Sequence, residues 1–181
     1  RDSVASRGLG DVYKRQNNTY CHDNEVNWYN WEQIASNQSQ EMIRFWSLLI
    51  EKRKKYIDSF RGRYFTGQLN KFGLPDISWH GTQLYNPGWD NSDARCLSMT
   101  LGDVAEVTDH TGNVHIMFNM FWEAVEFEIP QISGLVWSRS IDTALPAPQD
   151  IASHDQQVVI QGNKYLVSGR SIVTLVSRAS T

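Results

Sequence analysis

The second half of the chain is a series of short runs in which apolar and polar residues alternate. Such runs are typical of β-strands with one buried and one solvated face. In "AVEFEI" (Ala124–Ile129) the apolar side chains face one way, and Glu126 and Glu128 face the other. The other runs are "RCLSMTL" (Arg95–Leu101), "NVHIMFNM" (Asn113–Met120), "VWSRSI" (Val136–Ile141), "KYLV" (Lys164–Val167) and "SIVTLVS" (Ser171–Ser177). With the turn signals between them, they predict an antiparallel β-sandwich of about 100 residues.

The pattern before this region is helical. Between Ser39 and about Tyr56, apolar residues recur at three- and four-residue spacing. They are Met42, Phe45, Trp46, Leu49 and Ile50. Ser39 can cap the start of this helix, and the run Glu51–Lys55 places cations in its last turn, where they oppose the helix dipole. The apolar stripe is too wide for this short segment to bury, so we expect the helix to complete a domain whose remainder is missing.

Composition excludes several classes of protein. No apolar run approaches the roughly 20 residues that span a bilayer, so we expect no membrane partner. The net charge of −3 gives no general attraction for nucleic acid. Cys21 and Cys96 lie far apart without a CxxC pair, which is typical of reduced thiols in a cytoplasmic protein. The chain begins at Arg1 without an initiator Met, and we expect residues 1–16 to be a non-native leader on a fragment.

The spacing of acidic, histidine and cysteine residues argues against several kinds of catalytic or metal site. Glu126 and Glu128 would lie roughly 6.7 Å apart on one strand face, a separation that suits an inverting glycosidase, but two solvated acids are the simpler interpretation. The five histidines show no zinc-site spacing, so we expect no metal and no cofactor. Cys21 and His22 are adjacent, and adjacent side chains diverge too much for a reliable nucleophile–base pair.

Two segments combine aromatic residues with hydrogen-bonding residues. They are "NNTYCHDNEVNWYNW" (Asn17–Trp31) and "WHGTQLYNPGW" (Trp79–Trp89). Flat aromatic faces cover the apolar faces of sugar rings, while Asn, Asp and His supply hydrogen bonds to hydroxyls. The competing interpretation is that Trp28 and Trp31, three residues apart, only anchor a loop to the core. Spacing alone leaves both interpretations open.

The first of these segments resembles the loop after the eighth barrel strand in isoamylase-type glycogen debranching enzymes of the α-amylase superfamily (glycoside hydrolase family 13), closest to the bacterial members. The matching positions are Asn17, Asn18, Tyr20, Cys21, Asp23, Asn24, Trp28 and Trp31. The resemblance continues through "FRGRYFTGQ" (Phe60–Gln68), "LPDISWHGTQLYNPGWDN" (Leu74–Asn91), "FNMFWEAVEFEIP" (Phe118–Pro130), "DTALP" (Asp142–Pro146) and "LVSGRSIVTL" (Leu166–Leu175).

The resemblance implies a mostly β chain, with a C-terminal antiparallel β-sandwich after the last loop and helix of an incomplete (β/α)8 barrel. Residues 17–75 would end the barrel, and residues 76–181 would form the sandwich. The implied activity is hydrolysis of α-1,6 branch linkages in glycogen-like α-glucans, with catalytic acids upstream of this chain, so that the pair His22–Asp23 is not the family's signature pair. The implied substrate-binding residues are Asn17, Asn18, Tyr20 and Asp23, and the helix stripe would pack against the missing barrel.

Two other roles compatible with the same residues stay open for the chain by itself. It could be a non-catalytic module that binds carbohydrate through its sandwich, or a structural module that stabilises the barrel. Binding to glycogen that depends on Trp79 or Trp89 would favour the first of these roles.

Overall fold

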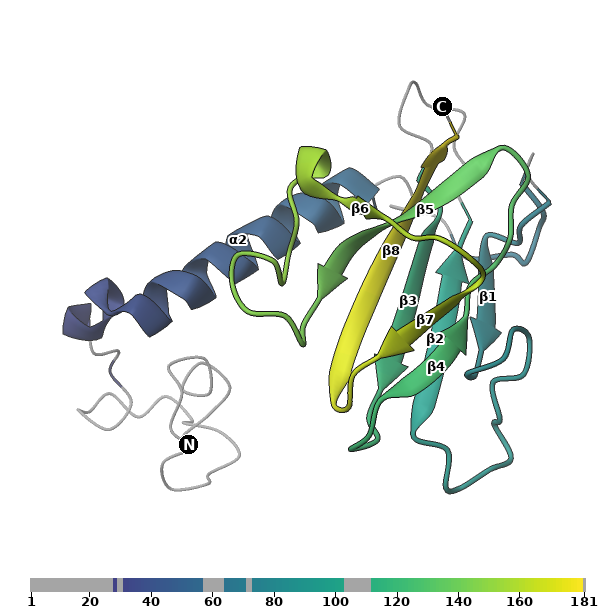
Figure 1. Ribbon diagram of the computed structural model, residues 1–181, viewed down its shortest axis with the longest axis horizontal. Helices are drawn as coiled ribbons and strands as arrows, with labels where there is room; N and C mark the ends of the chain where they lie inside the picture. Colours follow the sequence, from purple (N-terminus) through teal and green to yellow (C-terminus); the bar gives the residue numbers. More distant parts are fainter. Residues whose placement is uncertain (1–27, 29–30, 57–63, 71–72, 103–111, 181) are drawn as a thin grey trace. The chain divides into compact units, whose positions relative to one another are not determined.

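The structure is a computed structural model that describes residues 28, 31–56, 64–70, 73–102 and 112–180. The chain divides into two compact units, Arg1–Leu48 and Leu49–Thr181. In chain order the elements are η1 (Trp31–Ala35), α2 (Asn37–Tyr56), β1 (Ile77–His80), β2 (Cys96–Leu101), β3 (Val114–Asn119), β4 (Val125–Glu128), β5 (Leu135–Asp142), η3 (His154–Gln156), β6 (Val158–Val159), β7 (Lys164–Val167) and β8 (Ser171–Ala179) (Figure 1). All of these strands belong to the second unit.

Helix α2 is capped by the side chain of Ser36. The Ser36 Oγ accepts the backbone N–H of Ser39 at 3.3 Å and donates to the Ser39 hydroxyl at 3.0 Å. A cap of this kind satisfies one of the backbone donors that the first turn of a helix leaves without a partner. The prediction that Ser39 is the cap is therefore wrong, because Ser39 is the third residue of the helix and is buried. The last turn carries Arg53, Lys54 and Lys55, as the charge run predicts.

The larger sheet has six antiparallel strands in the order β1-β2-β3-β8-β5-β6. The last strand, β8, lies between β3 and β5, so it is an interior strand of the sheet (Figure 1). The register pairs Met117 of β3 with Val173 of β8, and Trp137 of β5 with Ser177 of β8. An irregularity between Arg139 and Ile141 shifts the register of β5 against β8. Residues far apart in the sequence are thereby fixed side by side.

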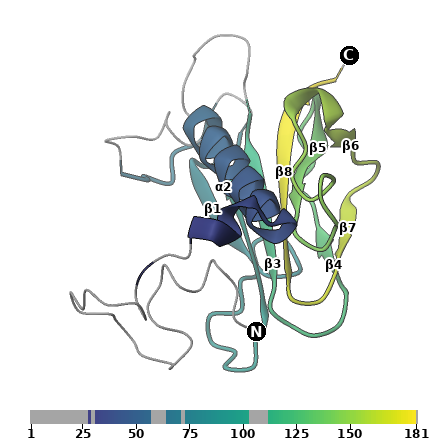
Figure 2. The same ribbon diagram turned by 90° about the vertical axis from the view of Figure 1, so that its left-hand side faces the viewer.

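Within the described part of the chain the second sheet consists of β4 and β7, and it packs against one face of the larger sheet (Figures 1 and 2). The contact is a cluster of buried side chains drawn from both sheets. Its members are Met117, Phe127, Ile129, Trp137, Val167, Val173 and Leu175. The Trp137 indole N–H donates to the Pro130 carbonyl at 2.6 Å, so the one polar atom of that ring is satisfied within the core.

The predicted fold class is confirmed, since every predicted run overlaps a strand and the sheets are antiparallel. Two strands were not predicted. Strand β1 is only four residues long and follows a Gly- and Pro-containing segment, while β6 has two residues, too few for an alternation to be recognised. The assignment of α2 to a barrel and the boundaries after residues 16 and 75 stay predictions.

The end of α2 is joined to the sandwich within the second unit. The Lys52 Nζ donates to the Ala152 carbonyl at 2.6 Å, and burial lowers the pKa of this amine. The Tyr56 ring lies against Gly112, where an added Cβ would come within 3.4 Å of it. The Tyr56 hydroxyl also accepts a hydrogen bond of 3.4 Å from Gln157. The orientation of the last turn of the helix is therefore set by the sandwich.

Strand β1 is anchored by Asp76, the buried residue immediately before it. Its carboxylate accepts the backbone N–H groups of Thr66 and Gly67, the latter at 2.8 Å, and the Thr66 hydroxyl at 3.0 Å. Burial raises the pKa of this carboxyl, but the hydrogen bonds together lower it by more, so the pKa lies below its ordinary value. The ionised side chain thus ties the segment before β1 to the sheet.

Asn119, at the end of β3, joins the two sheets through its amide. Its Nδ2 donates to the carbonyl oxygens of Glu123, Val167 and Ser168 at 2.8, 3.0 and 3.1 Å. Its Oδ1 accepts the Phe121 backbone N–H at 3.0 Å. Because the side chain is fully buried, water cannot replace any of these partners.

Replacing Asn119 with alanine removes the donor of the buried hydrogen bond to the Val167 carbonyl of β7 and of the hydrogen bonds to the Glu123 and Ser168 carbonyls. We expect the variant to lower the free energy of unfolding by about 2–4 kcal/mol, measured by urea denaturation followed by tryptophan fluorescence. The matched control is Asn86→Ala, because the Asn86 side chain is exposed and makes one long hydrogen bond of 3.5 Å to Gln83. That change should stay within about 0.5 kcal/mol. Equal losses in both variants would contradict the role given to Asn119.

Candidate functional site

The aromatic residues of the segment Trp79–Trp89 separate into two groups. Trp79 and Trp89 lie together, with ring centroids 5.8 Å apart and planes at 66°. His80 and Tyr85 form an edge-to-face pair with centroids 4.9 Å apart and planes at 82°. The division follows from strand geometry, because Trp79 and His80 are neighbours in β1 and neighbouring side chains leave a strand on opposite faces. The segment therefore presents two tryptophans outward and a histidine inward.

Both tryptophans are accessible and both are attached to fixed backbone. Their exposed fractions are 39% for Trp79 and 64% for Trp89. Trp79 sits in the ladder between β1 and β2, opposite Met99. Trp89 sits in a turn that is closed by the hydrogen bond from the Asn91 N–H to the Gly88 carbonyl at 2.9 Å. Gly88 has a φ of 69°, a conformation that side chains other than glycine rarely adopt.

A chain of buried hydrogen bonds begins at His80. Its Nδ1 accepts the backbone N–H of Tyr85 at 2.8 Å. Because that nitrogen is an acceptor, the neutral ring carries its proton on Nε2, which lies 2.9 Å from the Thr100 Oγ1 and 3.1 Å from the Ser78 Oγ. The Thr100 Oγ1 in turn lies 2.9 Å from the His115 Nδ1. These hydrogen bonds therefore connect the loop after β1 with β2 and β3.

His115 ends this chain in the interior. It is fully buried, and its Nε2 has no hydrogen-bond partner in the part of the chain that the structure describes. Burial, with a smaller contribution from the nearby His80, lowers the pKa of His115 to about 3, although the backbone of Glu128 acts weakly in the other direction. Burial also lowers the pKa of His80. Both rings are consequently neutral at physiological pH, and this series of hydrogen bonds is a structural network.

This network was not predicted from the sequence. The sequence does contain a sign of it, because polar residues occupy alternate positions of β1, β2 and β3 on the face that is buried against the core. These residues are Ser78, His80, Ser98, Thr100, His115 and Asn119. An alternating strand pattern identifies two faces but does not by itself say which of them is buried.

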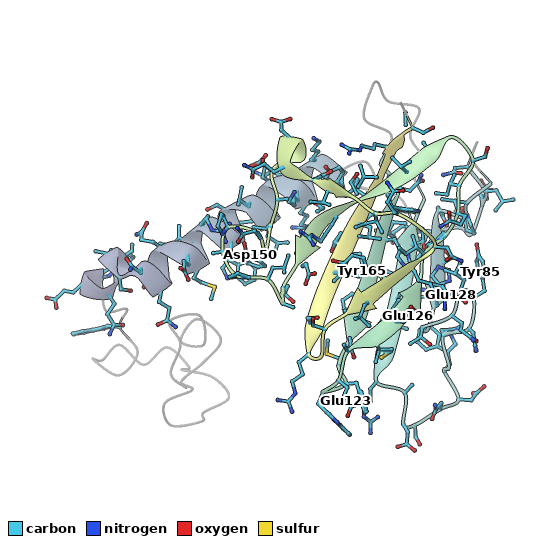
Figure 3. The ribbon with its side chains drawn as sticks, in the orientation of Figure 1. Tyr85, Glu123, Glu126, Glu128, Asp150 and Tyr165 are labelled. Carbon is cyan, nitrogen blue, oxygen red and sulfur yellow. The ribbon has the colours of Figure 1, made fainter. Side chains whose placement is uncertain are left out.

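Glu126 and Glu128 point to the polar side of β4, as the alternation predicts, and each has a separate partner (Figure 3). Glu126 forms an exposed ion pair with Lys164 at 2.6 Å. The Glu128 Oε2 accepts the backbone N–H of Leu84 at 2.9 Å, and the Glu128 N–H donates to the Thr82 carbonyl at 2.9 Å. Glu128 therefore holds the loop after β1, and neither carboxylate has the environment of a catalytic acid.

The four residues for which the resemblance implies substrate contact, Asn17, Asn18, Tyr20 and Asp23, lie outside the described residues, and so do Cys21 and His22. Their role stays a prediction. Trp28 and Trp31 are described and are 55% and 71% exposed, so neither side chain is buried. Cys96 is a half-buried free thiol, and burial raises its pKa.

No group of three or more His, Cys, Asp or Glu side chains within residues 28, 31–56, 64–70, 73–102 and 112–180 is arranged to hold a metal ion. Over the same ranges, no helix is both long enough and apolar enough to cross a membrane.

The buried His115 gives the stability of the chain a defined pH dependence. Its folded pKa of about 3 lies below the ordinary value of 6.5, so the unfolded chain takes up the proton first as the pH falls. The contribution of His115 to the free energy of unfolding should therefore be constant above about pH 6.5 and should decrease as the pH falls from 6.5 toward 3. At pH 5 we expect a loss of about 2 kcal/mol from this group, measured by urea unfolding at pH 5.0 and 7.5.

The control for this measurement is His115→Gln, which keeps a polar side chain but does not titrate. Other histidines are common to both proteins, so the difference between the two pH slopes isolates His115. If the variant loses as much stability between pH 7.5 and 5.0 as the original chain, His115 is not the group responsible.

Residues 76–176, more than half of the chain, match the family described as "Isoamylase, C-terminal". Isoamylase SU1, chloroplastic, from Zea mays is 30% identical over 152 residues, which are 78% of this chain and 17% of that protein. The glycogen operon protein GlgX homolog of Mycobacterium tuberculosis (strain ATCC 25618 / H37Rv) is 26% identical over 151 residues, which are 76% of this chain and 21% of that protein. The chain thus spans about a fifth of the length of these relatives.

A solved structure has a similar fold. The crystal structure of pullulanase type I from Bacillus subtilis str. 168, complexed with maltose, matches with a TM-score of 0.55 and 15% sequence identity, over 86% of this chain and 18% of that one. At this identity the likeness concerns the fold alone. The family match is the stronger finding, because it runs from the residue before β1 into β8 and so takes in both sheets of the sandwich. This chain belongs to the family of isoamylase C-terminal domains.

Proposed function

We propose that this chain is the C-terminal part of a glycogen debranching enzyme that hydrolyses α-1,6 branch linkages of glycogen or a related α-glucan. The observation that carries the proposal is the family match of residues 76–176. It is supported by relatives that are named as isoamylases and as a glycogen operon protein. In the parent enzyme, Asn17, Asn18, Tyr20 and Asp23 would form one rim of the glucan cleft.

The catalytic acids of the parent are proposed to lie outside this chain. Retaining hydrolysis of a glycosidic bond needs two carboxyl groups about 5–5.5 Å apart, one as nucleophile and one as acid and base. The sequence contains a candidate pair of carboxylates, Glu126 and Glu128. Glu126 pairs with Lys164, and Glu128 accepts the Leu84 N–H. These contacts support a structural role for both residues.

Helix α2 is proposed to be the last helix of the catalytic barrel. Of the predicted stripe, Trp46 and Ile50 are 52% and 50% exposed, whereas Met42, Phe45 and Leu49 are partly buried. Ile43, which was not predicted as part of it, is 44% exposed and lies on the same helix side by its three- and four-residue spacing to Trp46 and Ile50. A contiguous apolar stripe of this kind is normally covered in a folded protein, and the barrel wall is the partner that the family context offers. The contacts of Lys52 and Tyr56 with the sandwich support a second role, in which the sandwich fixes the end of this helix.

A non-catalytic module is the alternative function for the chain by itself. The exposed pair Trp79 and Trp89 favours the carbohydrate-binding form of this alternative. The hydrogen bond from Lys52 to Ala152 favours the barrel-stabilising form. Either role is compatible with a debranching parent, so the alternative supplements the proposal.

The chain alone should release no linear oligosaccharides from glycogen or pullulan, because the catalytic acids are proposed to lie elsewhere. A reducing-sugar assay with chromatography of the products measures this.

The parent enzyme, expressed from the gene that encodes the region upstream of Asn17, should debranch both substrates. In that enzyme Glu126→Gln and Glu128→Gln should change kcat by less than about twofold, since glutamine can still accept the Leu84 N–H. Debranching by the chain alone that is lost in Glu126→Gln would place the chemistry in the sandwich.

The exposed stripe on α2 should make the chain self-associate when its partner is absent. Sedimentation velocity at increasing concentration should show dimers or larger species, and Trp46→Glu should shift the chain toward monomer, because a charge in the stripe disfavours its burial. The matched control is Trp122→Glu, which changes an exposed tryptophan outside the stripe. A chain that stays monomeric without either substitution would argue against an unpartnered helix face.

A further inference from the structure

We propose that Trp79 and Trp89 form a site that binds an α-glucan chain on the surface of the sandwich. We call these two residues the tryptophan platform. The existence of a sugar-binding platform rests on its geometry and its electrostatic surroundings. The choice of an α-glucan as the sugar rests on the proposed function.

The geometry leaves indole surface available to a ligand. The two rings meet edge to face, with centroids 5.8 Å apart and planes at 66°, so they do not cover each other as stacked rings would. With 39% and 64% of their surface exposed, both contribute to the outside of the molecule. Aromatic faces of this kind cover the apolar C–H faces of sugar rings, and two rings from separate elements can contact successive sugars of one chain.

The platform is held in place before any ligand arrives. The loop that carries Trp89 is fixed at its start, where the Ser98 hydroxyl donates to the Gly81 carbonyl at 2.9 Å. It is fixed again where the Leu84 N–H donates to Glu128. Tyr85, next in the loop, keeps a φ of 59° while its N–H donates to His80. Such a backbone loses little conformational entropy on binding, and that makes a small aromatic contact effective.

The polar surroundings of the platform favour a neutral polyhydroxyl ligand. Asp90, Asn91 and Asp93 follow Trp89 in the same exposed loop, and Arg95 pairs with Asp93 at 3.7 Å. Aromatic platforms also bind single-stranded nucleic acid, but such sites add a groove of positive charge for the phosphates. Here the neighbouring charge is mainly acidic and the net charge of the chain is −3. Carboxylate and amide groups are suited to hydroxyl hydrogen bonds instead.

Trp122 provides a matched comparison within the same chain. It is 66% exposed, about as much as Trp89, but its ring lies against Phe121, with centroids 4.0 Å apart and planes at 32°. One indole face of Trp122 is therefore covered by a neighbour in the same loop. The platform is distinguished by two tryptophans that come together from different elements.

The test is affinity electrophoresis of the 181-residue chain in native gels that contain glycogen, with hydroxyethyl cellulose as the comparison polymer. We expect retardation by glycogen alone. Trp89→Ala should weaken the apparent affinity about tenfold or more, Trp89→Tyr should restore part of it, and Trp122→Ala should leave it unchanged. Trp79→Ala should act like Trp89→Ala. Urea unfolding of each variant separates loss of binding from loss of fold, and Trp89, in a surface turn, is the variant that should keep the fold.

Three outcomes would overturn the proposal. The first is the absence of retardation in glycogen gels. The second is retardation that survives both Trp79→Ala and Trp89→Ala. The third is equal retardation by hydroxyethyl cellulose, which would remove the assignment to α-glucans.

The parent enzyme separates this proposal from the proposed function. If both hold, Trp89→Ala should raise the KM for glycogen and leave kcat on a short branched oligosaccharide unchanged, because only the large substrate reaches both sites. Debranching that is absent from the parent while the chain still binds glycogen would contradict the proposed function and support the platform. A variant that loses activity on both substrates together with stability would identify the tryptophans as part of a contact with the barrel, and the platform would be rejected.

Discussion

The sandwich depends on the burial of Phe127, Ile129 and Val167 between its two sheets. A two-stranded sheet is at best marginally stable by itself, so β4 and β7 need the larger sheet as a partner. Their buried side chains meet Met117, Val173 and Leu175, which project from β3 and β8. Full burial of an apolar side chain of this size contributes roughly 1.5–3 kcal/mol. Because β8 is the last strand of the chain, this core is complete only when the C-terminal segment has entered the sheet.

The same core imposes a requirement on the first three strands. Apart from Met117, their inner face is mostly polar, and polar groups enclosed by a core must find partners inside it. The hydrogen bonds of His80, Thr100 and His115 largely meet that requirement, and Asn119 meets it at the far end of β3. The network also reaches outward, because His80 accepts the Tyr85 N–H and so helps to fix the loop that carries Trp89. The buried hydrogen bonds of His80 thus help to fix the position of the exposed Trp89.

The extent to which the structure could be predicted varies with the feature. Strand β7 was predicted at its observed bounds, Lys164–Val167, because turn residues bracket an apolar run. Strand β1 was not, since "ISWH" carries polar residues on its buried face and is recognisable only from its pairing with β2. The segment Trp79–Trp89 was identified as a group of interest, but the separation of two outward tryptophans from the buried His80 needed the strand. The residues for which the resemblance implies substrate contact are outside the described part of the chain and stay predictions; they are Asn17, Asn18, Tyr20 and Asp23.

By itself the sequence determined the class of the sandwich, the position of the helix and the family, because these depend on local periodicity and on motifs that are continuous along the chain. The tertiary structure decided which face of each strand is buried, and hence that Glu128 holds a loop and that a histidine network lies in the interior. It also decided that Trp79 and Trp89 meet, although nine residues separate them. The physical reason is that alternation along a strand defines two faces, whereas only the packing of a second sheet chooses between them.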